Sequence, residues 1–452
     1  MDSLYLVLLS SALFLCLGVA LEMGSSHPAS DFRFVYNSVR CLMQHADPYK
    51  QSEFVRVYLA DGGDLGSGFD RQAYMEMARH MYLPTSLLIA PLAMLPWKPA
   101  FVIWTILTAV SFLIASLLMW DLGAKYAPVL SGFLISSFLA TSESLLLTGN
   151  ATGMVVGLAV IAVWCFVEER FVRTGVILLA ISLMLKPHEA GLVWLYFLLA
   201  GGVYRKRALQ TLGAAVAFSA PLLAWVTVVA PHWLPELRSN LAVLSSHGHL
   251  NDPGPASMGG HGVGMIIDLQ SVISMFRDDP RIYNPASYLI CGVLLVAWSL
   301  TTLRSRPTPA RAWIALASIT ALSMLPVYHR LGDSKLLLIT VPACAMLWAE
   351  GGLIGSAALA INTAAILLTG ELQWAIFLRV LGSMSQSTTG LSEKLRIGVQ
   401  IFPVPLMLLV VSVFYLWVYI RRASDNSVDT RGKLRPAEVT GPVEVGTVPS
   451  LD

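Results

Sequence analysis

Three short groups of ionisable side chains interrupt long apolar runs, and their residue types suit chemistry at an oxygen atom. Asp31 follows the first apolar run, Lys186 separates two runs in the middle of the chain, and Arg330 separates two more. A carboxylate can take the proton of a hydroxyl group that lies within hydrogen-bond reach. Lysine binds phosphate as a point charge, and arginine binds it through a planar fork of donors. We therefore expect these three residues to gather around one pocket that holds a hydroxyl group and a phosphate.

Asp31 is a candidate general base because it lies just beyond the first apolar run, near the expected bilayer surface. A carboxylate at this level stays ionised and still faces a site between helices. The alternative is a structural role, in which Asp31 caps an amphipathic surface helix by accepting hydrogen bonds from amides two or three residues on. His329 is a rival base, since imidazole titrates near neutral pH without help.

The sequence Lys186-Pro187-His188-Glu189 places three ionisable groups within four residues at membrane depth. Such groups are costly in lipid, and they usually face a cavity or one another. Lys186 and His188 are therefore candidates for binding a phosphate, and Glu189 for binding a sugar or an acceptor. The alternative is a lysine at a helix end that extends to the interface, with Pro187 starting the next helix.

The segment Tyr328–Lys335 also separates two apolar runs. Its Arg330 offers planar donors that match a phosphate. An ordinary hairpin turn is the alternative, with a surface pair between Arg330 and Asp333 worth about 0–1 kcal/mol. The two interpretations differ in whether the arginine faces a pocket or the solvent.

Gly149-Asn150 is a weaker candidate in the middle of the chain. Glycine permits a close approach of the backbone, and Asn150 can bond to a sugar hydroxyl group. A plain tight turn accounts for the same two residue types. Glu143, shortly before this pair in an apolar stretch, is a further candidate for a buried acid.

The long polar segment 231–285 contains a His-Gly-His sequence at 247–249 and a further histidine, His261. Histidines can bind zinc, but neither tight ligand spacing nor a cysteine accompanies these three, so we expect no metal. Long segments without obvious secondary structure are functional or disordered. We interpret this one as a lid rich in glycine and proline, in which Asn251 and Asp252 contact a sugar or an acceptor.

Composition excludes a water-soluble globule. Of the 452 residues 56% are hydrophobic and 13% are charged, whereas soluble domains average about 45–50% and about 25%. The 30 basic and 28 acidic residues give a net charge of +2 and form no long basic stripe, which argues against nucleic acid as a partner. Four of the five cysteines lie in apolar runs, and no disulfide framework or metal motif follows from their spacing.

The apolar runs predict an all-α polytopic membrane protein of about 12 transmembrane helices with long extracytoplasmic loops, in a single domain over 1–422. The first run is longer than the core of a cleaved signal peptide, so we expect it to be retained. Leu83–Pro96 is short and ends at prolines, which favours a re-entrant or interfacial element. The expected spans are 4–22, 99–120, 127–147, 151–168, 171–185, 190–204, 208–230, 286–303, 312–325, 335–349, 352–370 and 400–420.

Basic residues orient these spans, because short cytoplasmic loops carry an excess of lysine and arginine. With the N-terminus inside, nine basic residues lie in short cytoplasmic connections and three in short outer ones. Arg421 and Arg422 follow the last span, so both termini are expected in the cytoplasm, with a disordered tail at 423–452. All nine histidines then lie on the outer side. The long outer loops are expected at 23–83, 231–285 and 371–399.

Several motifs follow one another in a recognisable order. They are Asp31-Phe32 with Tyr36 four residues after Phe32, Asp47-Pro48-Tyr49, Tyr82-Leu83-Pro84 with Pro91-Leu92-Ala93, Gly149-Asn150 and Lys186-Pro187-His188. In this order the sequence resembles glycosyltransferase family 87, from about residue 1 to residue 350 and most clearly in the first hundred residues. That family consists of polytopic enzymes with the membrane GT-C fold, related to polyprenol-phosphate-mannose-dependent α-mannosyltransferases.

The resemblance implies the inverting transfer of a sugar from a polyprenyl-phosphate donor to a hydroxyl group of a lipid or glycan acceptor, on the outer side of the plasma membrane and without a cofactor. The sugar is expected to be mannose or another hexose or pentose. The expected catalytic base is Asp31 or His329. The expected contacts of the donor phosphate are Lys186, His188, Arg330 and Arg33. The expected contacts of the sugar or acceptor are Tyr36, Asn150, Glu189, Asn251 and Asp252.

A transporter or flippase for a lipid-linked or small sugar is the alternative, since it also needs polar groups within the membrane. Transporters place their sites centrally, between the broken helices of repeated halves. In this sequence the ionisable groups cluster on one face, and no internal repeat is visible. A non-enzymatic scaffold fits least well, because six polar segments converge on one side.

Overall fold

The computed structural model describes residues 2–25, 30–79, 82–255, 257, 266–370 and 403–432. These residues are predominantly helical, and the one β-type pairing among them is an isolated bridge between Ile266 and Arg330. Seven of their helical segments are long and apolar enough to cross a membrane. The chain is an all-α polytopic membrane protein, as the apolar runs predict.

The seven long segments occur from the beginning of the chain to its end. They are α1 (Asp2–Gly24), α6 (Trp97–Ala124), α7 (Pro128–Ala140) with α8 (Ser144–Leu147), α12 (Gly202–Val229), α15 (Pro280–Arg304), η2 (Leu331–Ile339) with α17 (Thr340–Glu350), and α21 (Pro403–Gly432). On α12 large apolar side chains such as Val216 and Val228 are exposed. Exposed apolar surface of this kind is suited to contact with lipid.

Five shorter helices complete the bundle, and their length explains why the predicted spans there are short. They are α9 (Thr152–Val167), α10 (Val172–Leu185), α11 (Pro187–Ala200), α16 (Pro309–Ser323) and α18 (Gly352–Leu368). Nearly every side chain of α9 and of α16 is buried. Neighbouring helices therefore shelter these two, and they need not match the full thickness of the hydrocarbon core.

Two details differ from the sequence-based expectation. The predicted span 127–147 is interrupted, since α7 ends at Ala140 and the four-residue α8 follows. Arg205–Arg207 were expected in a connecting loop but lie in the first two turns of α12. Gly201, with φ of +78°, ends α11 abruptly, so the connection is minimal. Basic side chains do not interrupt a helix, because their stems cover apolar surface while their charged ends reach water or a partner.

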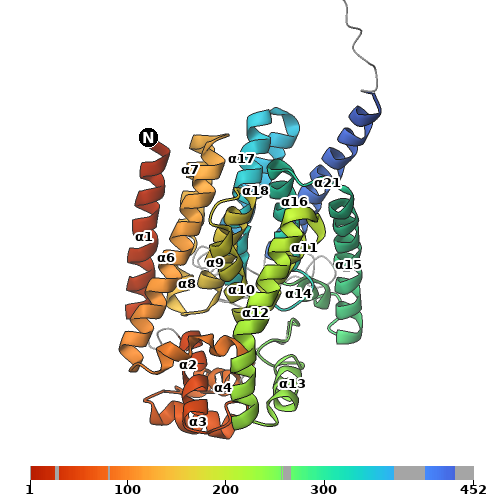
Figure 1. Ribbon diagram of the computed structural model, residues 1–452. Helices are drawn as coiled ribbons and strands as arrows, with labels where there is room; N and C mark the ends of the chain where they lie inside the picture. The colour runs from red at the N-terminus through yellow and green to blue at the C-terminus, as the bar shows by residue number, and fades with distance from the viewer. Residues whose placement is uncertain are drawn as a thin grey trace, which may run out of the picture.

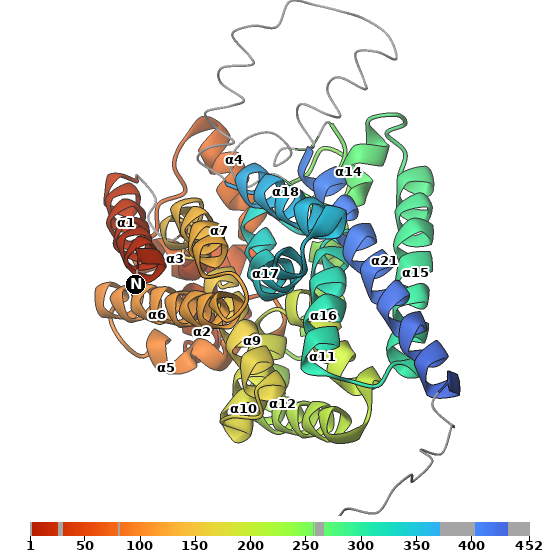
Figure 2. The same ribbon diagram turned by 90° about the horizontal axis from the view of Figure 1, so that it is seen from above.

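Figure 1 shows that the start of α1 and the far end of α21 lie at the same end of the bundle. The opposite end carries α2 (Ser30–Met43), α3 (Gln51–Ala60), α4 (Gly68–Met77) and α13 (Trp233–Leu244). Seen along the bundle in Figure 2, α16 and α17 stand between α1, α6 and α7 on one side and α15 and α21 on the other.

The expected outer loops contain helices of their own. The first holds α2 to α4, and the second holds α13 and α14 (Leu269–Ser274), while the third, at 371–399, lies outside the described residues. The stretch Leu83–Pro96 forms η1 (Pro84–Ile89) and α5 (Ala90–Ala93), which are together too short for a crossing. Helix α21 continues to Gly432, beyond the predicted start of the tail, and 433–452 are not described.

Candidate active site

Helix α2 brings Asp31 to the bundle. Its apolar side chains recur at 32, 35, 36 and 39, the spacing of one buried helix face. Phe32 stacks on Trp104 and Trp97 of α6, with ring centroids 4.6 and 5.5 Å apart. The backbone N–H of Asp31 donates to the carbonyl oxygen of Thr148 at 3.0 Å. These contacts fix the start of α2 against α6 and against the turn that precedes α9.

The Asp31 carboxylate faces that turn. Its Oδ2 atom accepts a hydrogen bond from Nδ2 of Asn150 at 2.6 Å. The turn is shaped by Gly149, with φ of +60°, whose carbonyl oxygen accepts from the indole N–H of Trp104 at 2.8 Å. Burial raises the pKa of Asp31, whereas the bond from Asn150 and the positive charges of Arg330 and Lys186 act in the opposite direction.

A hydrogen-bond network links this turn to Lys186. The Oδ1 atom of Asn150 accepts from the backbone N–H of Thr152 at 2.9 Å, which fixes the orientation of the amide. The Lys186 ammonium lies 2.5 Å from Oγ1 of Thr152 and 2.6 Å from Oδ1 of Asp333. Pro187 starts α11, as the structural alternative proposed, but the ammonium is turned into the protein and forms an ion pair there.

Arg330 approaches the same group from the segment before η2. Its backbone N–H donates to Oδ2 of Asp333 at 2.9 Å, and its guanidinium bonds to the Tyr328 hydroxyl group. Asp333 is buried and forms an ion pair with Lys186, so it is not part of an exposed hairpin turn. The charges of Arg330 and Asp31 act on each other, which places both in one electrostatic environment.

The second outer loop is joined to this segment by backbone pairing. Ile266 forms the isolated antiparallel bridge with Arg330, and the N–H of Ile267 donates to the carbonyl oxygen of His329 at 3.0 Å. The Arg330 guanidinium also donates to the carbonyl oxygen of Leu250 at 3.4 Å. The loop and the arginine are therefore held as one unit.

His188, Glu189 and His329 form a second group beside Lys186. The rings of His188 and His329 lie 5.0 Å apart, and Nε2 of His329 is 3.8 Å from Oε2 of Glu189. Glu189 and His329 are fully buried, whereas His188 is exposed. Burial lowers the pKa of His329, which favours a neutral imidazole.

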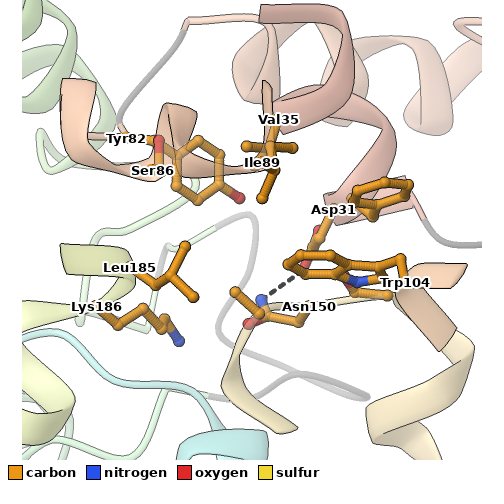
Figure 3. Close-up of a pocket in the computed structure, with 12 residues that line it drawn as sticks. Asp31, Val35, Tyr82, Ser86, Ile89, Trp104, Asn150, Leu185 and Lys186 are labelled. Carbon is orange, nitrogen blue, oxygen red and sulfur yellow. Dashed lines mark hydrogen bonds between the residues drawn. The ribbon is translucent and has the colours of Figure 1, made fainter. Parts of the chain in front are cut away.

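A pocket opens between these elements, and Figure 3 shows the side chains that line it. Asp31, Asn150, Tyr82 and Lys186 contribute polar groups, and the phenol of Tyr82 and the ammonium of Lys186 point into the space from different sides. The rest of the lining is largely apolar, including Phe32, Val35, Ile89, Trp104 and Leu185. The pocket combines a carboxylate and a cation with apolar walls, which suits a hydroxyl group and an anion attached to a lipid.

Arg33 and Tyr36 of α2, which the sequence predicts as contacts of the substrates, bind to other parts of the protein. The Arg33 guanidinium lies 5.0 Å from the ring centre of Trp97, and it donates to the carbonyl oxygen of Gly62 at 2.5 Å. The Tyr36 hydroxyl group donates to the carbonyl oxygen of Leu95 at 2.8 Å. Both side chains therefore hold α2 in place, and neither lines the pocket around Asp31.

The predicted contacts in the second outer loop also make bonds within the protein. The Asp252 carboxylate accepts from the N–H groups of Gly248 and Gly254, at 2.7 and 2.9 Å. The backbone N–H of Asn251 donates to the carbonyl oxygen of Leu244 at 2.8 Å. These bonds shape the loop. Glu143, the candidate buried acid, is indeed almost fully buried.

Three residues of the site were not predicted as functional. Thr152 and Asp333 connect Asn150 to Lys186, and Tyr82 lines the pocket beside Asp31. Asp333 lies in the polar segment Tyr328–Lys335, and Tyr82 begins the Tyr82-Leu83-Pro84 motif. The sequence therefore singles out both segments, although not these two residues as functional. Thr152 stands at the start of an apolar run without any distinguishing pattern.

The fold and the site define a polytopic membrane protein with an acidic and cationic pocket at one end of its bundle. The chain matches the model of glycosyltransferase family 87 over residues 82–326, more than half of its length, and belongs to that family. It is a membrane glycosyltransferase, and neither the transporter nor the scaffold alternative has support. No curated protein matches the sequence. The matched range contains Asn150 and Lys186, while Asp31 and Arg330 lie outside it.

Proposed function

We propose that this glycosyltransferase moves a sugar, mannose or another hexose or pentose, from a polyprenyl-phosphate donor to a hydroxyl group of a lipid or glycan acceptor, with inversion. The observation that carries the proposal is the shared pocket of Asp31 and Lys186, in which a carboxylate and an ammonium line the same apolar space. A polyprenyl chain partitions into lipid at about 0.8 kcal/mol per buried CH₂, which brings its phosphate to the level of these side chains.

In the proposed reaction, Asp31 takes the proton of the acceptor hydroxyl group while the acceptor oxygen attacks the anomeric carbon opposite the phosphate. The bond between that carbon and the phosphate oxygen breaks, and its electron pair stays on the phosphate. Lys186 and Arg330 stabilise the charge that develops there. The raised pKa of Asp31 makes it a stronger base than an exposed aspartate.

Asp31 is a better candidate for the base than His329. The Nδ1 atom of His329 lies 2.9 Å from the carbonyl oxygen of Val327, and its Nε2 atom faces Glu189. Asp31 lines the pocket, and His329 is not among the residues that do. His329 therefore fits a role beside the pocket.

The proposal is tested by measuring transfer from a synthetic polyprenyl-phosphate mannose with purified enzyme. Asp31→Asn is expected to lower kcat by about 10²–10⁴-fold, the usual contribution of a general base. Asp121→Asn is the matched control, since Asp121 is exposed on α6 away from the pocket, and its kcat is expected to stay unchanged. Wild-type kcat in Asp31→Asn would reject Asp31 as the base.

We propose that the pocket opens on the outer side of the plasma membrane and that both termini are cytoplasmic. The excess of basic residues in the connections at the α1 and α21 end supports this orientation. Single cysteines at position 64 and at position 206, both exposed, test it in a cysteine-free background. A membrane-impermeant thiol reagent added to intact cells should label the first and spare the second, and the reverse pattern would invert the topology.

A further inference from the structure

Four side chains with atoms that ligate metals meet beside the pocket. His188, Glu189, His329 and Asp333 each offer one such atom, and these atoms all lie within 4.8 Å of one another. They come from the first turn of α11 and from the segment around the start of η2. Three of the four residues are buried, and His188 is exposed.

Several of these atoms are buried hydrogen-bond acceptors without a donor. Over the described residues, both carboxylate oxygens of Glu189 lack a hydrogen-bond partner, and Nε2 of His329 makes no hydrogen bond of full geometry, although the backbone of His188 lies close to this ring. The Nδ1 atom of His329 lies 2.9 Å from the carbonyl oxygen of Val327, which only accepts, so the ring proton belongs on Nδ1. Nε2 then presents its lone pair to Glu189. Burying such acceptors without a donor is costly, and a cation between them would remove that cost.

The ammonium group of Lys186 is not the cation that these acceptors bind. Lys186 donates to Thr152 and to Asp333, and Asp333 accepts through both of its oxygens. A proton shared between Glu189 and His329 does not satisfy both groups either. The distance of 3.8 Å between Oε2 of Glu189 and Nε2 of His329 is too long for a hydrogen bond. Two neutral imidazoles and one carboxylate, in contrast, are a known ligand set for a divalent transition metal.

We propose that His188, Glu189 and His329 bind one divalent transition-metal ion, Zn²⁺ or Mn²⁺. The bond from Nδ1 of His329 to a backbone carbonyl is the usual support of a histidine ligand. Three protein ligands leave a coordination position for water or for a phosphate oxygen. Two ligands of a tetrahedral ion lie about 3.4 Å apart, so Glu189 and His329 need only approach each other slightly. The exposed face of His188 gives the ion access.

The site was not expected from the sequence, because His188 and His329 stand far apart along the chain and form no spacing motif. Binding of the ion does not depend on the proposed reaction. A contribution of the ion to stabilising the leaving phosphate does rest on that reaction, so the test measures binding and not transfer.

The full-length enzyme in detergent is stripped with a chelator and dialysed against Zn²⁺ alone or Mn²⁺ alone. Elemental analysis is expected to find one ion per chain, and bound Mn²⁺ is expected to lose its free-ion electron paramagnetic resonance signal. His188→Ala and Glu189→Gln are expected to weaken binding by about 100-fold or more, beyond the loss of a supporting group. Since His188 is exposed, its variant is the one that keeps the fold.

Two further variants serve as controls. His249→Ala removes one member of another histidine–carboxylate pair, with Glu76, and is expected to retain the ion. His247→Ala disrupts the second group of possible ligands, His247 with Asp252 and Asp278, and is also expected to retain it.

Three results would overturn the proposal. They are wild-type enzyme without bound Zn²⁺ or Mn²⁺, loss of the ion in His247→Ala with retention in His188→Ala, and an infrared band of a protonated carboxyl group that disappears in Glu189→Gln. If the ion is absent and transfer persists, the metal proposal fails alone. If the ion is bound and Asp31→Asn transfers normally, the assignment of Asp31 fails alone.

Discussion

Two buried lysines next to the candidate site differ in what their ammonium groups contact. Lys335 is fully buried and donates to the carbonyl oxygens of Thr141 and Thr369, at 2.6 and 2.9 Å. Lys186 is largely buried and pairs with the Asp333 carboxylate at 2.6 Å. The described hydrogen bonds of Lys335 therefore go to backbone carbonyl groups, whereas Lys186 pairs with a carboxylate side chain.

We interpret Lys335 as a structural cation and propose that Lys186 is available to a substrate. Thr141 and Thr369 are the C-caps of α7 and α18, so Lys335 joins two helix ends, where carbonyl groups lack partners within their own helix. Lys186 lines the pocket and can exchange a carboxylate for a phosphate without loss of backbone bonds. Both lysines are largely buried, so the group that each ammonium contacts is what distinguishes them.

The largest expected effect is that of Lys186→Met. Turnover should fall by about 10²–10³-fold, as for loss of one donor to a developing charge. Stability should fall by about 3–5 kcal/mol, because Asp333 loses its partner. The double variant Lys186→Met/Asp333→Asn should regain stability, measured by thermal unfolding in detergent, and remain inactive. Recovery of transfer by the double variant would contradict the role of Lys186.

Lys335→Met should show the opposite pattern. Loss of the ammonium leaves buried carbonyl groups without its hydrogen bonds, which costs about 2 kcal/mol. The unfolding temperature should drop, while the specific activity of the folded fraction stays within about twofold of wild type. An unchanged unfolding temperature with lost transfer would place Lys335 in the active site and end the distinction between the two lysines.

Asn150→Ala extends the comparison to the group that holds Asp31. Transfer should fall by about tenfold, since a positioning bond to a charged group, worth about 1.5 kcal/mol, is lost. The bond from Asn150 lowers the pKa of Asp31, so its removal raises that pKa. Activity needs the ionised carboxylate, and the acidic limb of the pH profile of kcat/KM should therefore move to higher pH. A limb at its original pH would show that Asn150 does not act through Asp31.

Arg33→Gln should have the smallest effect. The cation–π contacts of Arg33 with Trp97 and Tyr58 are worth about 1 kcal/mol in stability. Because its guanidinium is already used within the protein, KM for the donor should change by less than about twofold. A tenfold rise in KM, measured by steady-state kinetics, would support Arg33 as a contact of the donor phosphate.

The helices could be predicted from the sequence to a large extent, because an apolar run in a polytopic protein has few other uses. All twelve predicted spans overlap helices of the described residues, and seven helical segments there are long and apolar enough to cross a membrane. The break after Ala140 was missed, since apolar residues continue on both sides of it. The sequence does not predict that α12 begins before its basic residues, at Gly202. A basic cluster marks a membrane boundary and not the end of a helix.

The candidate site was less predictable, for a reason that Arg33 and Lys186 illustrate. Lys186 stood out because a charge between apolar runs needs a partner, and the structure brings it into one pocket with Asp31, near Arg330. Its partner Asp333 lies 147 positions further along the chain, so only the packing of the helices brings the two side chains together. Arg33 follows Asp31 in a motif, but adjacent helical residues point in different directions, and tertiary packing alone decides which one meets the pocket.

The pairing of Ile266 and Ile267 with His329 and Arg330 has a mechanical consequence. Any displacement of Ile266 and Ile267 would pull on the stretch His329–Arg330, with which they are paired. Withdrawal of that stretch removes positive potential from around Asp31 and weakens its acidity at the same moment. The pairing therefore couples the position of Ile266 and Ile267 to the proton affinity of the Asp31 carboxylate.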